Sequence, residues 1–200
     1  MFKKLFTLTI ILAVAAGGFA QSINPDLLGK KMTLAIKQEQ QLKSKIYTND
    51  EDIIISGGMA MPVRFIRVEK NIPNLIVQYV FSEKDSIIRK IEYEWDVRNF
   101  DKSDHNVKPL AFNKALIERY NSLVKFFNQK YGAGTTKGDL SDLTKIEVLG
   151  GLTRSDKWNN GQVDVLMYTT ISNHYEATAY GARIPTHRIR LYLSEPRKVL

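Results

Sequence analysis

The chain contains no cysteine, and histidine is scarce. The first absence excludes disulfides, thiolate metal sites, a cysteine nucleophile and a lipid anchor on cysteine. Only His105, His174 and His187 occur, and none belongs to an HExxH motif or a His-x-His pair. Catalytic zinc sites usually fix two ligands by such local spacing. We therefore predict no metal site and no cofactor; a zinc site built from His174, Glu176 and His187 is the remaining alternative.

Signatures of several enzyme classes are also missing. The glycine-rich segment 132–138 contains a lysine but lacks the Gly-Lys-Ser/Thr ending of a phosphate loop, and it follows a helical pattern rather than a strand. No Gly-x-Ser-x-Gly motif supports a hydrolase serine. Lysine and arginine outnumber acidic residues by 29 to 21, but they are scattered along the chain. Nucleic-acid binding requires a concentrated basic surface with stacking aromatic residues, so we predict no nucleic-acid partner.

Long hydrophobic runs are absent except at the start of the chain. Lys3 and Lys4 precede an uncharged apolar segment, residues 5–16, and the small residues Gly18 and Ala20 follow. This layout predicts a signal peptide, residues 1–20, because the apolar run is shorter than the ~20 residues of a membrane span. We expect residues 21–200 to form one domain, periplasmic or secreted, without a transmembrane segment. Cleavage would lower the formal net charge from +8 to +6.

The residues around the expected cleavage site, Phe19-Ala20-Gln21-Ser22, resemble those of exported proteins from Bacteroidota-type bacteria. The resemblance covers the signal region only. It implies export and carries no activity.

Alternation of apolar and polar residues predicts a sheet. The clearest strand is 87–97, where odd positions are apolar except Arg89, and even positions from Lys90 onward are charged. Such alternation is typical of a sheet with one buried and one solvated face. The short loops between neighbouring strands indicate an antiparallel meander. The other strands are expected at 63–69, 75–81, 162–171 and 187–193, with a shorter one at 145–149.

Two helices are expected beside this sheet. The stronger one spans 109–131, where apolar residues fall on one side at helical spacing and Gly132 supplies the C-cap. A weaker pattern predicts a second helix at 26–44. Segments 132–142 and 173–185 are interpreted as loops.

This order of elements predicts an α+β protein. A mainly antiparallel sheet is packed by one long amphipathic helix with an N-terminal helix beside it, and the order suggests two halves, each a helix followed by a meander. The order resembles that of small outer-membrane assembly factors and β-lactamase inhibitor proteins over about half the chain. The resemblance implies a helix-plus-sheet envelope protein and transfers no functional residue.

The sequence predicts no catalytic site, although three residues are candidates for acid–base chemistry. Glu92 and Glu94 share one face of the strand at 87–97, and His174 lies in a loop. Two carboxylates about 7 Å apart could serve as the acid and base of a glycosidase. The alternative is a solvated strand face, on which the carboxylates pair with Arg188 and Arg190 across the sheet.

Four residues are candidates for binding: Trp158, Arg188, Arg190 and Tyr192. Trp158 precedes the Asn159-Asn160-Gly161 turn and lies outside a clean period, so it is either an exposed contact or a tryptophan at the edge of the core. We predict a non-catalytic envelope or secreted protein that binds another protein or an anionic glycan. The alternatives are a hydrolase of envelope polysaccharide or peptidoglycan and an inhibitor-like module.

Overall fold

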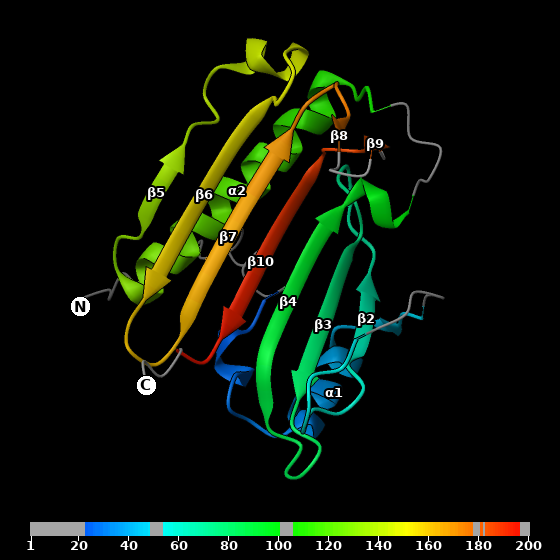
Figure 1. Cartoon of the computed structure of the whole chain (residues 1–200), viewed down its shortest axis with the longest axis vertical. Coiled ribbons are helices and arrows are strands. Elements are labelled where there is room, and N and C mark those ends of the chain that lie inside the picture. Colours follow the sequence, from blue (N-terminus) through cyan, green and yellow to red (C-terminus); the bar gives the residue numbers. More distant parts are fainter. Residues whose placement is uncertain (1–22, 49–53, 101–105, 178–180, 182, 197–200) are drawn as a thin grey trace, which may run out of the picture.

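The computed structural model describes residues 23–48, 54–100, 106–177, 181 and 183–196. An eight-stranded sheet forms one layer, and two α-helices form a second layer on one of its faces (Figure 1). The predicted signal peptide lies outside the described residues. The α+β class, the antiparallel sheet and the long helix with an N-terminal helix are confirmed.

The sheet is built from two meanders that meet in the middle. Its strand order is β1-β2-β3-β4-β10-β7-β6-β5, and all neighbouring strands are antiparallel. The first half contains a short 3₁₀ helix (Pro25–Leu27), α1 (Met32–Gln41), β1 (Lys45–Ile46), β2 (Val63–Arg67), β3 (Leu75–Phe81) and β4 (Ile88–Asp96). The second contains α2 (Leu110–Tyr131), β5 (Thr135–Gly138), β6 (Leu152–Asn159), β7 (Asp164–Ile171) and β10 (Arg188–Ser194).

Each half is therefore a helix followed by four strands, and the last strand of each half pairs with the other. The two-half organisation expected from the element order is thus present. Two further 3₁₀ helices, Val97–Asn99 and Leu143–Glu147, and a small hairpin of β8 (Glu176–Ala177) and β9 (Arg183–Ile184) complete the described elements.

A β-bulge explains why Arg89 breaks the alternation of its strand. The register with β3 shifts between Val80, which faces Lys90, and Phe81, which faces Ile88. The extra residue moves Ile88 rather than Ile87 into the core, whereas Ile91, Tyr93 and Trp95 keep the predicted phase. From Lys90 onward the charged residues consequently share the opposite face.

The core lies between the helices and the sheet. The inward side chains of α2 and of the central strands are almost completely buried, among them Leu116, Tyr120, Leu123, Phe127, Tyr93, Trp95, Ile189 and Leu191. Arg119 of α2, at the margin of this apolar stripe, forms a 2.6 Å ion pair with Glu69 and lies over the Trp95 ring. This arginine therefore pairs with a carboxylate of the first half although it belongs to the long helix. Burial lowers the Arg119 pKa, against the opposing effect of Glu69.

The N-terminal helix is shorter than predicted. It begins at Met32 rather than Asp26, because Gly29 adopts a φ of +75° and turns the chain between the 3₁₀ helix and α1. The main chain at Gly29 also donates to the Ile88 carbonyl, which ties this turn to β4. The helix ends at Gln41, and Lys43 takes a positive φ of 56° before β1.

The prediction was least accurate between the long helix and β7. The expected loop 132–142 contains edge strand β5, and the expected strand 145–149 is absent, because its first three residues belong to the 3₁₀ helix Leu143–Glu147. Strand β6 was missed because its core-facing positions include the polar Arg154 and Asp156, which disguise the alternation. The expected loop 173–185 contains β8 and β9. Among the described helices, none is long and apolar enough to cross a membrane.

Candidate functional site

One face of the sheet is covered by α1 and α2. The charged residues that alternation predicts on one side of the strands lie on the opposite face. We call this surface the open face. Figure 1 shows the helices behind the strands, so the side chains toward the viewer belong to the open face. Its centre is formed by outward residues of β4, β10 and β7: Lys90, Glu92, Glu94, Asp96, Arg188, Arg190, Tyr192, Leu166, Tyr168 and Thr170.

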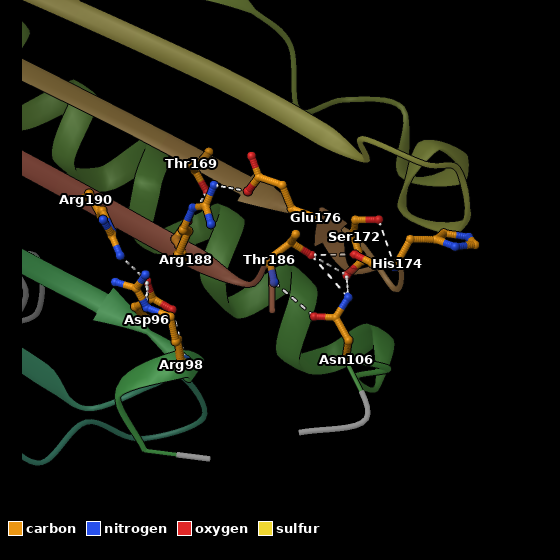
Figure 2. A network of polar contacts seen from close by, with 10 residues as sticks. All are labelled: Asp96, Arg98, Asn106, Thr169, Ser172, His174, Glu176, Thr186, Arg188 and Arg190. Atoms are coloured by element: carbon orange, nitrogen blue, oxygen red, sulfur yellow. Dashed lines mark hydrogen bonds and ion pairs between the residues drawn. The ribbon is translucent and has the colours of Figure 1, made fainter. Parts of the chain in front are cut away.

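The two predicted binding arginines are paired with acids on this face. In the antiparallel register Arg190 stands opposite Glu94, and Arg188 stands opposite Asp96. Arg190 Nη2 lies 2.7 Å from Asp96 Oδ2, and Arg190 Nε lies 3.6 Å from Glu94 Oε1. Arg188 donates to Glu176 of the β8–β9 hairpin at 2.5 Å (Figure 2). The predicted pairing with acids of β4 is confirmed for Arg190, whereas Arg188 pairs with Glu176 instead of an acid of β4.

These pairs are partly withdrawn from solvent although the helices cover only the other face. The side chains of Arg188 and Arg190 are 13% and 15% exposed, and Asp96 is fully buried. Burial acts to lower the Arg190 pKa, but Glu94 and Asp96 outweigh it and raise the pKa above its ordinary value. Because both guanidinium groups already bind carboxylates, they offer little uncompensated positive charge to an external anion.

An aromatic row crosses the open face beside the arginines. The rings of Tyr168 and Tyr192 are stacked, with centroids 6.1 Å apart, and Lys90 Nζ lies 5.0 Å from the centroid of the Tyr192 ring. Burial is the largest cause that raises the pKa of Tyr192, and the hydrogen bond with the neighbouring Tyr168 is the second. Sequence reasoning missed Tyr168, because β7 does not alternate cleanly. Only the register of an antiparallel β7–β10 pair, which sets Tyr168 opposite Arg190, could have assigned it to this face.

A buried polar cluster fixes the loops at the end of this face (Figure 2). Asn106, fully buried with a φ of +60°, donates from Nδ2 to the Ser172 carbonyl at 3.0 Å and accepts from the Thr186 main chain at 2.9 Å. Thr186 Oγ1 lies within hydrogen-bond distance of two carbonyl oxygens, 2.8 Å from that of Ser172 and 3.0 Å from that of His174. These contacts join the loop before α2 to the loops that flank the β8–β9 hairpin. They hold Glu176 where it reaches Arg188.

Two of the three predicted catalytic candidates lie together in a small pocket. The pocket has a volume of about 200 Å³ and lies on the open face over β2, β3 and β4; we call it the β4 pocket. Its lining residues are Tyr47, Arg64, Ile76, Gln78, Glu92, Glu94, Arg98 and Asn99. Glu92 accepts from Gln78 at 2.6 Å and pairs with Lys90. Glu94 accepts from Asn99 Nδ2 at 3.3 Å.

The third candidate, His174, does not line this pocket. Its Nε2 lies 2.7 Å from the Glu147 carbonyl oxygen, beyond the end of β7. His187 is buried against Phe112, with ring centroids 5.8 Å apart, and His105 lies outside the described residues. Among the residues that the structure describes, no three His, Cys, Asp or Glu side chains are grouped as metal ligands.

Trp158 occupies the core, the second of its two alternatives. It is 4% exposed, its ring packs 5.2 Å from that of Phe127, and its Nε1 donates to Asn128 Oδ1 at 2.9 Å. It also borders a groove of about 580 Å³ on the sheet, together with Lys90, Lys157, Asn159, Asp164, Val165, Leu166, Tyr192 and Ser194. Because its ring packs against α2, Trp158 does not offer that ring to a ligand on the open face.

Comparison of the chain with protein-family models, curated proteins and solved structures found no match.

Proposed function

We propose that the chain is an exported, non-catalytic protein of the cell envelope or its surroundings, and that its open face binds another protein. The observation that carries this proposal is the aromatic row, in which Tyr168 stacks on Tyr192 and Lys90 lies over the Tyr192 ring. This row lies beside the paired arginines of β10. Stacked tyrosines supply a large contact area at a small entropic cost, and hydrogen-bonded strands hold them in place.

Charge pairing favours a protein partner over an anionic glycan. A polyanion gains affinity from uncompensated cations, whereas Arg190 contacts Asp96 and Arg188 contacts Glu176. The Tyr192 ring also has two neighbours within the protein, because Tyr168 stacks with it and Lys90 lies over it. A sugar that requires a bare aromatic face therefore finds less support than a protein surface with mixed polar and apolar groups.

The hydrolase alternative has weaker support. Glu92 and Glu94 share a pocket, but Glu92 already accepts from Gln78 and pairs with Lys90. A glycosidase requires two carboxyl groups whose surroundings differ enough to make one the acid and the other the base. An inhibitor-like module remains compatible with the proposal, since an inhibitor is one kind of protein partner.

The proposal is tested by capture from envelope extract on immobilised protein at low and high salt. We compare the natural chain with the double variant Tyr168→Ala/Tyr192→Ala, using Lys125→Ala on the exposed side of α2 as the matched control. We expect a protein partner that is retained at high salt, is lost with the double variant and is kept by the control. Capture of a polysaccharide that high salt releases would support the glycan instead. No capture, or capture that the double variant leaves unchanged, would contradict the proposal.

A further inference from the structure

The β4 pocket carries charges of both signs on a polar wall. Carboxylates come from Glu92 and Glu94 of β4, and guanidinium groups come from Arg64 of β2 and Arg98 of the 3₁₀ helix that follows β4. The side-chain amides of Gln78 and Asn99 add hydrogen-bonding groups, and Ile76 is the aliphatic residue in the lining. Such a lining disfavours an apolar ligand and suits a polar molecule of small size.

Two of these charged side chains, Glu92 and Arg64, make short contacts within the protein. Glu92 accepts from Gln78 Nε2 at 2.6 Å and forms an ion pair with Lys90. Arg64 donates from Nε to Gln78 Oε1. These hydrogen bonds link Arg64 of β2, Gln78 of β3 and Glu92 of β4 in series, and they hold the three side chains in place at the floor of the pocket.

The other two charges have only long contacts. Glu94 has Asn99 Nδ2 at 3.3 Å and Arg190 Nε at 3.6 Å, longer than the ~2.7–2.9 Å of a strong charge-assisted hydrogen bond. The guanidinium of Arg98 approaches Asp96 Oδ2 only to 3.9 Å. In the described part of the chain, no ion pair of 4.0 Å or less joins Glu94 to Arg98. A carboxylate and a guanidinium thus line one pocket, each with capacity for a shorter partner.

We propose that the β4 pocket binds a small zwitterion, a molecule of amino-acid size with one ammonium group and one carboxylate. The ammonium group contacts Glu94, and the carboxylate contacts Arg98. The volume of about 200 Å³ suits a free α-amino acid better than a peptide. This site is separate from the aromatic row proposed to contact a protein, so each proposal can fail without the other.

Nuclear magnetic resonance titration of the labelled protein tests the ligand class. The probes are glycine, alanine and dialanine, with methylamine and acetate as analogues that each lack one charge. We expect saturable shifts of the Gln78 and Asn99 side-chain amides, and binding of alanine about tenfold tighter than that of either analogue. Tighter binding of dialanine than of alanine would assign the site to a peptide and overturn the amino-acid proposal.

Two variants test the assigned contacts. Glu94→Gln and Arg98→Gln keep size and polarity while removing one charge, and each is expected to weaken alanine binding about tenfold. Glu83→Gln, on the exposed turn before β4, is the control and should bind as the natural chain does. Thermal unfolding confirms that the variants fold. The proposal is overturned by no saturable binding up to ~10 mM alanine, by equal affinity for acetate or methylamine, or by unchanged affinity in both variants.

Discussion

The hydroxyl group of Tyr79 in β3 donates to the fully buried carboxylate of Glu39 in α1, with 2.6 Å between the oxygen atoms. Arg67 of β2 forms an ion pair with the same carboxylate. The second half contains a similar group, in which Tyr120 of α2 donates to Asp156 at 2.7 Å and Arg154 pairs with it at 2.9 Å. Each helix is thus joined to its meander by a tyrosine, a carboxylate and an arginine.

Removing the charge of Glu39 should destabilise the fold strongly. Glu39→Gln removes the buried carboxylate that pairs with the Arg67 guanidinium, which is 9% exposed, and breaking a buried ion pair costs about 3–5 kcal/mol. Urea unfolding measures the loss. The control is Asp26→Asn, which removes the exposed partner of Lys130 and should cost less than about 1 kcal/mol. Equal losses in the two variants would show that burial does not determine the energetics of this pair.

The Asp156 carboxylate should contribute to stability above acidic pH. Burial acts to raise its pKa, but hydrogen bonds from Arg154, Thr136 and Tyr120 outweigh burial and hold the pKa below its ordinary value. Because the folded pKa is lower than the unfolded value of about 3.9, the contribution is present above pH 4 and is lost as pH falls through the folded pKa.

Urea unfolding of the natural chain and of Asp156→Asn between pH 2 and pH 7 measures this contribution. The variant should lose less stability on acidification than the natural chain. An identical acid dependence in the two proteins would contradict the assigned pKa shift.

Adjacent glycines before β6 should respond differently to alanine. Both have positive φ, +88° at Gly150 and +61° at Gly151. A Cβ at Gly150 would meet nothing within 4 Å, whereas one at Gly151 would lie 2.4 Å from the Ile171 carbonyl oxygen. Gly150→Ala should therefore cost about 1 kcal/mol from backbone strain alone, and Gly151→Ala at least about 3 kcal/mol. Thermal melts compare the two, and a smaller loss at Gly151 would show that β6 and β7 are not packed as described.

Trp158 should prove structural rather than a contact residue. Trp158→Ala removes a buried ring that packs on Phe127, so we expect a loss of about 3–5 kcal/mol in the free energy of unfolding. Trp158→Phe keeps much of the packing but loses the hydrogen bond to Asn128, and should cost less. A folded Trp158→Ala protein with nearly natural stability and reduced partner capture would instead assign Trp158 to binding.

The sequence predicted the sheet best where one face is purely apolar. The pattern of β4 and β10 located the strands, their faces and the pairing of Arg190 with acids of β4, since alternation and antiparallel register together determine which residues meet. It failed where polar groups enter the core. Asp156 and Arg154 point toward α2 and satisfy one another there, so β6 lacked the alternation that would have revealed it.

The candidate site was only partly predictable. Arg188, Arg190 and Tyr192 lie on one strand face, which periodicity alone assigns. Glu176, the partner of Arg188, lies in the β8–β9 hairpin, and its contact with Arg188 depends on the buried Asn106 cluster rather than on any local pattern. The β4 pocket likewise joins residues from several separate elements, a convergence that spacing in one sequence does not encode.

Site-specific photo-crosslinking tests most directly whether the open face is the contact surface. A photoreactive amino acid replaces Leu166, beside the aromatic row, or Lys125, on the exposed side of α2. Illumination in envelope extract should yield one discrete protein adduct from position 166 and none from position 125. Adducts from position 125 alone, or the same adducts from both positions, would contradict the proposal that the partner binds the open face.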